Sequence, residues 1–281
     1  MRAPAQRLPH PPVRALGQIL GLKWGRIQFT SDLLPSDILG YWAPDFEKPS
    51  AEFKFHKGPI FAQFVLGDEL NRASPKTQSA CLQAMEEAKV TLEGETFPLP
   101  APFFFVATQN PREVAGTHAL PLSQLDRFMT RMKLGYPTVQ AEEKLMRQID
   151  GQADLPQLNS VPGIVDQLAA VQKIHVSQSI AEYMVRLLNK SRERSKQRKS
   201  ELRYLGLSPR AGLDWIASAK ARAYMQDRDF VTPDDLQFVG PMVVNHRILQ
   251  QDGAYDTAAP EETVDFCVSE AKKFIQSVKV I

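Results

Sequence analysis

FVLGDELNRA, at residues 64–73, is the stretch of sequence that decides the fold. It contains the end of a continuous apolar run, 60–67, whose length is typical of a strand buried on both faces. Such strands occur almost only in parallel sheets that helices cover. Two carboxylic acids, Asp68 and Glu69, follow the run directly. The stretch therefore predicts an α/β core with acidic side chains at the end of a buried strand.

A second run of the same kind, FFFVAT at 103–108, finishes in the polar residues Thr108, Gln109 and Asn110, and Pro111 follows. In open parallel sheets, ligands bind at the carboxyl ends of the strands, so these polar residues and the acidic pair are candidates for one site. One carboxylate can hold a hard cation through water, while a second carboxylate and an amide orient an attacking water. On the residues alone, a solvated loop that begins with Asp-Glu is the alternative.

Shorter signals place further elements around these two strands. Ser74 and Pro75 form an N-cap and a first-turn proline, and apolar residues at helical spacing follow as far as Ala88. Alternating residues on both sides of Glu93-Gly94 predict a hairpin over 90–99. The other predicted elements are helices at 13–22 and 123–128 and strands at 25–30 and 132–136.

Beyond Pro137 only helical patterns follow, at 164–171, 180–189, 211–225, 233–248 and 262–278. Strands in the first half and helices in the second predict two parts that fold side by side. The expected organisation is an atypical Pro-rich start (1–12), an α/β core (13–138), a linker (139–160) and an α-helical domain (161–281).

Two arginines lie at positions where each is expected to have an anion as its partner. Arg210 follows Ser208-Pro209 and so lies at the second position of a helix. There the positive end of the helix dipole disfavours a cation by roughly 0.3 to 1 kcal/mol, unless an anion meets it. Arg127 lies in the segment LDRF. A snorkelling surface side chain is the alternative for Arg210, and a plain ion pair is the alternative for Arg127.

The segments FVLGDELNRA, SPKTQSACLQAMEE, VATQNP, LSQLDRF and LGLSPRA come in this order, and in order and spacing they resemble the MoxR branch of the AAA+ ATPases. The resemblance extends from about residue 13 to at least residue 235. It implies a parallel-sheet core of the AAA+ P-loop NTPase type followed by an all-α lid. It also implies hydrolysis of ATP to ADP and phosphate with Mg²⁺ as cofactor.

By this resemblance, five residues have roles at the nucleotide. Asp68 is similar to the Walker B aspartate that organises Mg²⁺, and Glu69 to the glutamate that polarises the attacking water. Asn110 is similar to the sensor-1 residue that positions this water. Arg127 resembles the arginine finger, which acts on the nucleotide of a neighbouring subunit, and Arg210 resembles the sensor-2 arginine of the lid, which reaches the same phosphates.

The resemblance also implies partners. It predicts a homo-oligomeric, hexameric ring in the cytoplasm that acts like a chaperone on client protein complexes, often with proteins that bear a von Willebrand factor A domain. The hairpin at 90–99 is similar to the helix-2 insertion of this branch, and Gly67 stands where the family commonly has alanine. The alternatives are a magnesium-chelatase-like or DNA-motor AAA+ subunit and a catalytically dead scaffold subunit.

One feature of the family has no counterpart in this sequence. Such a nucleotide site needs G-x-x-x-x-G-K-[ST], because the backbone N–H groups of this loop and its lysine hold the phosphates. Gly17, Gly21 and Lys23 have the wrong order and spacing, and the lysine is expected near Pro9, in a Pro-rich stretch that cannot begin an anion-binding helix. The core strand before the loop is also missing. We expect weak ATP binding by this chain, through an incomplete or altered N-terminus or through natural loss in a non-binding paralogue.

Composition argues against several other classes of protein. The net charge is +2, which does not predict a nucleic-acid partner, and a solvated connection explains the basic segment 190–203 better than nucleic-acid contact does. The longest apolar run, 101–107, is far shorter than the about 20 residues of a membrane span. Cys81 and Cys267 fit buried thiols in a reducing compartment, and the cysteines and histidines lack metal-ligand spacing.

Overall fold

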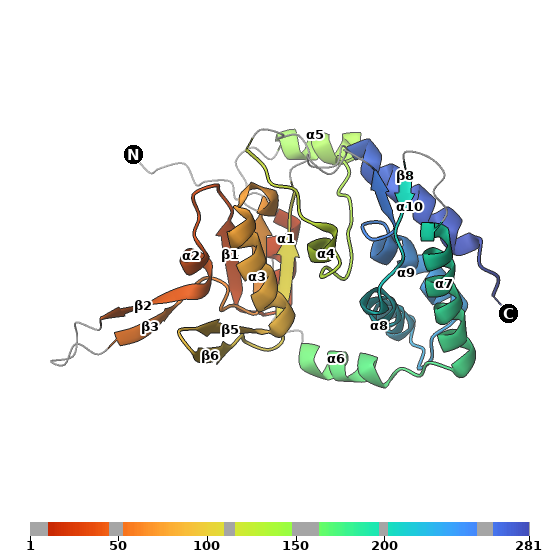
Figure 1. Ribbon diagram of the computed structural model, residues 1–281, viewed down its shortest axis with the longest axis horizontal. Helices are drawn as coiled ribbons and strands as arrows, with labels where there is room; N and C mark the ends of the chain where they lie inside the picture. The colour runs from red at the N-terminus through yellow and green to blue at the C-terminus, as the bar shows by residue number, and fades with distance from the viewer. Residues whose placement is uncertain are drawn as a thin grey trace.

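The computed structural model describes residues 11–44, 53–109, 116–147, 163–196, 202–251 and 261–280, which form an α/β part and a mainly helical part (Figure 1). The α/β part contains α1 Pro11–Ile19, β1 Trp24–Gln28, α2 Pro35–Leu39, β2 Gly40–Pro44, β3 Phe53–Lys57, β4 Phe64–Asp68, the 3-10 helix η1 Leu70–Arg72, α3 Pro75–Glu87, β5 Lys89–Leu92, β6 Glu95–Pro98, β7 Phe104–Ala107 and α4 Leu122–Leu125. After it come α5 Val139–Arg147, α6 Ile164–Lys173, α7 Gln178–Lys196, β8 Leu202–Tyr204, α8 Pro209–Met225, α9 Pro233–Val244, β9 Leu249–Gln251 and α10 Glu261–Gln276.

The central sheet is parallel, as the two apolar runs predicted. β4 lies between β1 and β7, and all five of its residues are buried. The register pairs Gln28 with Asp68 and Gly67 with Ala107, so the carboxyl ends of the three strands meet at one edge. The prediction of an α/β core with a parallel sheet is confirmed, and the ends of the two apolar runs are neighbours.

Gly67 is explained by the packing of this sheet. A Cβ atom added at Gly67 would lie 2.7 Å from the ring of Phe105 and 2.9 Å from the ring of Phe29. Real Cβ atoms do not approach ring carbons this closely, because overpacking a dense core costs free energy. Glycine at this position therefore lets two aromatic rings approach the strand that carries the acidic pair.

Only the second half of the apolar run at 60–67 forms a strand. β4 begins at Phe64, and the preceding residues form a buried turn in which the N–H of Ile60 donates to the carbonyl of Ile38 in α2 at 3.3 Å. A continuous apolar run reports burial, and burial does not distinguish a strand from a packed turn. The predicted helix at 123–128 is likewise shorter, since α4 spans only Leu122–Leu125.

The predicted strand at 132–136 is wrong. These residues are irregular, and Leu134 and Tyr136 are each 72% exposed. The backbone before them is held by the helical part instead, since the N–H of Arg131 donates to the carbonyl of Met242 at 2.9 Å. Alternation predicts a strand only where a neighbouring strand can pair with it, and among the described residues none pairs with this segment.

The expectation that only helices follow Pro137 is also wrong in one respect. β8 and β9 form an antiparallel pair in which Tyr204 lies opposite Leu249. The two strands have three residues each, too few for a period of two to stand out in the sequence. The range 139–160, predicted as a linker, contains helix α5 and residues outside the described ones.

Two antiparallel hairpins extend from the α/β part (Figure 1). β5–β6 is the predicted hairpin, and its turn residues Glu93 and Gly94 both have positive φ, at 50° and 87°, which suits the tight turns of hairpins. β2–β3 was not predicted. Its Phe55 ring stacks on Phe97 of β6 with centroids 4.2 Å apart. The likeness of β5–β6 to a helix-2 insertion stays a prediction, and β2–β3 is a further hairpin that directly follows α2.

The helical part has its own core around Trp215. This side chain is fully buried and its Nε1–H donates to the carbonyl of Leu236 at 2.7 Å, which satisfies the polar atom of the ring.

Cys267 of α10 belongs to this core, and Cys81 belongs to the core of the α/β part. Both cysteines are free, as predicted, and burial raises the pKa of Cys81 to about 12. None of the helices in the described ranges is long and apolar enough to cross a membrane.

Candidate functional site

Asp68 is a buried carboxylate at the carboxyl end of β4. The residue is 2% exposed. Its Oδ1 accepts a hydrogen bond from Thr108 Oγ1 at 2.7 Å, and its Oδ2 accepts one from Arg26 Nη2, also at 2.7 Å. A buried charge is tolerated when it is paired and hydrogen-bonded, and here Arg26 of β1 and Thr108, just after β7, supply these contacts.

Glu69 lies directly beside Asp68 but leaves the strand direction. Its backbone has φ 58° and ψ 48°, a left-handed conformation that is uncommon for residues other than glycine and persists only where the surroundings hold it. A hydrogen bond holds this conformation, because the Glu69 N–H donates to Thr108 Oγ1 at 2.9 Å. Its carboxylate, with 23% of the side chain exposed, accepts from Gln28 at 3.2 Å and from Arg72 at 3.1 Å. One acid is thus buried while its neighbour faces water.

Arg26 is a site residue that the sequence analysis missed, whereas Thr108 is one of the polar residues that it expected at the site. The Thr108 hydroxyl joins both members of the acidic pair, and Arg26 neutralises one of them. A signal was available for Arg26, because a charged residue inside the strand segment GRIQFT needs a partner when the strand is covered. The predicted sensor-1 residue, Asn110, lies outside the described residues.

The acidic pair has the chemistry of a magnesium site, whereas the given sequence contains no motif of the phosphate-binding loop. Asp68 offers the carboxylate oxygens that Mg²⁺ prefers, at the edge of the sheet where ligands of such folds bind. Helix α1, which follows the expected place of the loop, begins with Pro11 and Pro12, and proline has no N–H to donate to a phosphate. The sequence contains no G-x-x-x-x-G-K-[ST].

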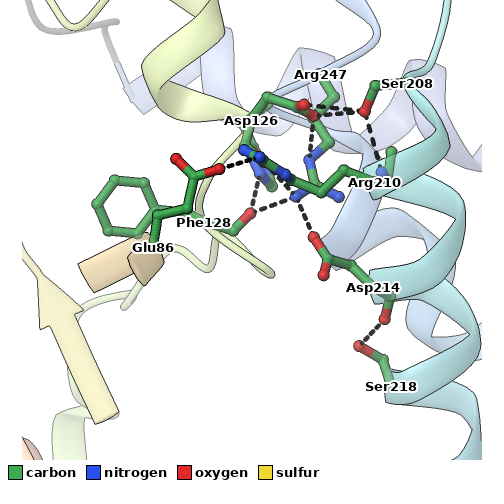
Figure 2. A network of polar contacts seen from close by, with 10 residues as sticks. Glu86, Asp126, Phe128, Ser208, Arg210, Asp214, Ser218 and Arg247 are labelled. Atoms are coloured by element: carbon green, nitrogen blue, oxygen red, sulfur yellow. Dashed lines mark hydrogen bonds and ion pairs between the residues drawn. The ribbon is translucent and has the colours of Figure 1, made fainter. Parts of the chain in front are cut away.

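Arg127 and Arg210 meet at one carboxylate, that of Glu86 in the last turn of α3. Arg127 Nε lies 3.1 Å from Glu86 Oε2, and Arg210 Nη2 donates to Glu86 Oε1. Figure 2 shows Glu86 pointing toward Arg210 and toward the segment that carries Asp126 and Phe128. All three charged side chains are partly open to water, with 28% of Arg127, 41% of Arg210 and 36% of Glu86 exposed.

The structure does not bring the two predicted groups of site residues together. Gln78, in the first turns of α3, donates to the carbonyl of Leu70 beside the acidic pair. Glu86 lies eight residues farther along the same helix, which is about 12 Å at 1.5 Å per residue. Asp68 and Glu69 form one cluster, and Arg127 and Arg210 form a second one at the junction of the two parts.

Arg247 ties the segment around Arg127 to the helical part (Figure 2). The Arg247 side chain is 2% exposed, its Nε lies 3.1 Å from Asp126 Oδ1, and its Nη2 lies 2.6 Å from Asp214 Oδ2. It also donates to the backbone carbonyls of Asp126 and Phe128, on either side of Arg127, at 2.9 and 2.7 Å. Ser208, the N-cap of α8, donates to the Asp126 carboxylate at 2.9 Å. The same contacts thus position Arg127 and the helix start that carries Arg210.

The two residues before Arg247 strengthen this junction. The Asn245 side chain exchanges hydrogen bonds with Arg131, whose Nε donates at 2.7 Å. His246 Nε2 lies 2.9 Å from the Phe128 carbonyl, and because a carbonyl only accepts, this nitrogen carries the proton. Burial, together with the charges of Arg247 and Arg131, lowers the pKa of His246 to about 3, against the opposing effect of the Phe128 carbonyl. His246 is therefore neutral in the folded protein.

We expect His246 to make the free energy of unfolding fall as the pH is lowered. Its pKa is about 3 in the folded chain and about 6.5 in an unfolded chain. Between these values the unfolded state binds the proton and the folded state does not, so stability is lost by up to about 1.4 kcal/mol per pH unit below about 6.5. Urea unfolding between pH 7 and pH 5 measures this slope.

His246→Gln should flatten the slope, whereas His56→Gln, at an exposed position, should leave it unchanged. Parallel pH curves for the wild-type chain and His246→Gln would contradict the prediction.

Comparison with known proteins agrees with the fold and the motifs. Residues 11–130 match the family described as the ATPase family associated with various cellular activities (AAA), and residues 195–265 match the AAA lid domain. The part that contains the sheet and the helical part are therefore those of an AAA-type ATPase core and its lid.

Individual relatives show to which branch of the AAA ATPases the chain belongs. The chain is 40% identical to Bacillus subtilis YeaC, described as uncharacterized, over 84% of this chain and 72% of that protein. It is 35% identical to the chaperone MoxR1 of Mycobacterium tuberculosis, over 90% of this chain and 68% of that protein. A crystal structure of a candidate ATPase from Cytophaga hutchinsonii superimposes with a TM-score of 0.76 at 33% identity, over 92% of this chain and 79% of that one. The chain belongs to the MoxR-type AAA+ ATPases.

Proposed function

We propose that this chain is a subunit of a MoxR-type ATPase that hydrolyses ATP with Mg²⁺ and uses the energy for chaperone-like remodelling of partner proteins. The observation that carries the proposal is the Asp68–Glu69 pair at the carboxyl end of a buried parallel strand, with Thr108 of the neighbouring strand bonded to both residues. This is the arrangement that orients a cation and a water for phosphoryl transfer.

Each residue contributes a separate part of the chemistry. Thr108 and Arg26 fix the Asp68 carboxylate, which would hold the metal ion through water. Bound Mg²⁺ supplies positive charge that neutralises the phosphates. Glu69 accepts a proton from the attacking water at its exposed carboxylate, and Asn110 orients that water.

The two arginines give the reason to expect a ring. Arg127 and Arg210 lie together at the core–lid junction, in a cluster separate from the acidic pair, where Arg127 can serve the nucleotide of a neighbouring subunit as an arginine finger. Arg210 is proposed as the sensor-2 arginine at the phosphates. The proposed assembly is a homo-oligomeric, hexameric ring in the cytoplasm. Its proposed partners are client complexes and von Willebrand factor A domain proteins.

The chaperone name of the Mycobacterium tuberculosis relative supports the remodelling activity. The chain's own nucleotide affinity is proposed to be low, because its sequence contains no phosphate-binding loop. That feature favours a second candidate function, a ring subunit that scaffolds active neighbours without hydrolysing ATP itself.

Thermal unfolding with and without excess Mg-ATP tests the proposed affinity. A ligand at about 100 times its dissociation constant adds roughly 2.7 kcal/mol to the free energy of unfolding, so a competent site would raise the melting temperature clearly. We expect no shift for this chain and a clear shift for a chain extended by a G-x-x-x-x-G-K-[ST] segment.

A shift in the unextended chain that Arg210→Ala removes would contradict the proposed weak binding. It would show that nucleotide is held without the usual loop. No shift in either chain would contradict the ATPase proposal and leave the scaffold function.

A further inference from the structure

Glu86 holds two cations with a single negative charge. Within the described ranges it is the one carboxylate that contacts either Arg127 or Arg210. The other acids at the junction, Asp126 and Asp214, pair with Arg247 instead. Arg247 brings one charge to two carboxylates, so the three arginines and three carboxylates of the junction balance, and Arg127 and Arg210 share a single carboxylate where all three side chains reach water.

The start of α8 adds positive potential beside Arg210. Arg210 lies in the first turn of this 17-residue helix, which has no acidic residue there. Unpaired N–H groups at a helix start carry partial positive charge and favour an anion. Glu86 gives each of the two arginines a single carboxylate oxygen, whereas a polyphosphate offers several charged oxygens, and guanidinium groups bind phosphate in a bidentate fashion.

The arginines do not depend on Glu86 for their positions. Arg247 holds the backbone on both sides of Arg127, and Ser208 joins the start of α8 to Asp126. These contacts are separate from Glu86. If the Glu86 carboxylate leaves, the backbones that carry the two arginines therefore stay in place, and an anion that enters can be reached by both side chains.

We propose that Glu86 is an internal counter-ion that occupies the Arg127–Arg210 pair and that a polyphosphate displaces from it. The inference rests on the proposed function in one respect, namely that the polyphosphate in a working ring is that of a nucleotide. The contact is then autoinhibitory, because the phosphates must compete with a carboxylate that the chain itself supplies.

Titration calorimetry with inorganic tripolyphosphate tests this proposal on the 281-residue chain at low salt without Mg²⁺. Glu86→Gln keeps the size of the side chain and removes its charge, so we expect it to bind tripolyphosphate about tenfold more tightly than the wild-type chain, which corresponds to about 1.4 kcal/mol. Glu86→Asp, whose shorter side chain cannot reach both arginines in the same way, should give an intermediate gain.

Glu87→Gln is the matched control. Glu87 is the next residue of α3 and lies 3.7 Å from Lys89, away from the arginine pair, so its loss changes the net charge equally and should leave the affinity at the wild-type value. Adding Arg210→Ala to Glu86→Gln should abolish the gain. Equal affinities of the wild-type and Glu86→Gln chains, or the same gain in Glu87→Gln, would overturn the proposal.

The result is separable from the proposed ATPase function. Tripolyphosphate has no nucleoside and needs no phosphate-binding loop, so a gain in Glu86→Gln supports the counter-ion even if the loop-bearing chain hydrolyses no ATP. Conversely, hydrolysis by the loop-bearing chain together with unchanged tripolyphosphate binding would overturn the counter-ion alone.

Discussion

In a chain extended by a G-x-x-x-x-G-K-[ST] segment, Glu69→Gln is expected to lower the rate of ATP hydrolysis by about 10² to 10⁴, the usual contribution of a positioned acid or base, and to leave ATP binding unchanged. The amide cannot accept the proton of the attacking water. The geometry should survive, because the bond that sets the Glu69 backbone runs from its own N–H to Thr108, and the amide oxygen can still accept from Arg72.

Glu95→Gln is the matched control, since Glu95 is exposed on the β5–β6 hairpin. It should hydrolyse ATP at the rate of the parent chain. Single-turnover hydrolysis and nucleotide binding, measured separately, check the prediction. Full turnover by Glu69→Gln would refute the proposed role of this residue, whereas loss of binding would point to a structural defect instead.

Arg247→Ala is expected to lower the free energy of unfolding by about 3 kcal/mol, near the lower end of what the loss of one partner of a buried ion pair costs. The substitution leaves Asp126 and Asp214 without their cation and removes one donor from each of two backbone carbonyls, of which that of Phe128 keeps His246. Both aspartates retain some exposure, at 25% and 20% of the side chain, and water can replace part of the lost contact.

Lys133→Ala provides the comparison. The Lys133–Asp265 contact, at 2.7 Å, also joins the two parts of the chain, but 66% of the Asp265 side chain is exposed, and exposed pairs contribute about 0 to 1 kcal/mol. Urea unfolding should separate the two variants, and hydrogen exchange near Asp126 and Phe128 should accelerate only in Arg247→Ala. Equal, small losses in both variants would show that the buried junction does not hold the parts together.

The sequence by itself predicted the sheet and one half of the site. The run that ends in Asp68 and Glu69 reports burial through composition alone, and adjacency in the chain guarantees that the two acids lie together at the end of β4. The helix N-caps at Ser74 and Ser208 were predictable for the same reason, because each cap is formed within four residues. Local chemistry decides all of these features.

The alternating residues at 132–136 show where a local pattern is insufficient. Alternation predicts which side chains share a face, but a strand also needs a partner for its backbone, and the backbone N–H of Arg131, just before this segment, donates to Met242 in the lid. Arg26 was missed for a related reason, since only the register of β1 with β4 brings it to Asp68.

The tertiary structure alone decided the second half of the site. Arg210 and Glu86 are 124 positions apart, and the contacts of Arg247 with Asp126 and Phe128 span about as much chain. Contacts of this kind leave no periodic signal in the sequence, because which buried charges meet depends on how two separately packed cores are placed against each other. Asp68 and Glu69 were joined by the covalent chain, and Arg127, Arg210 and Glu86 only by the folding of the lid onto the core.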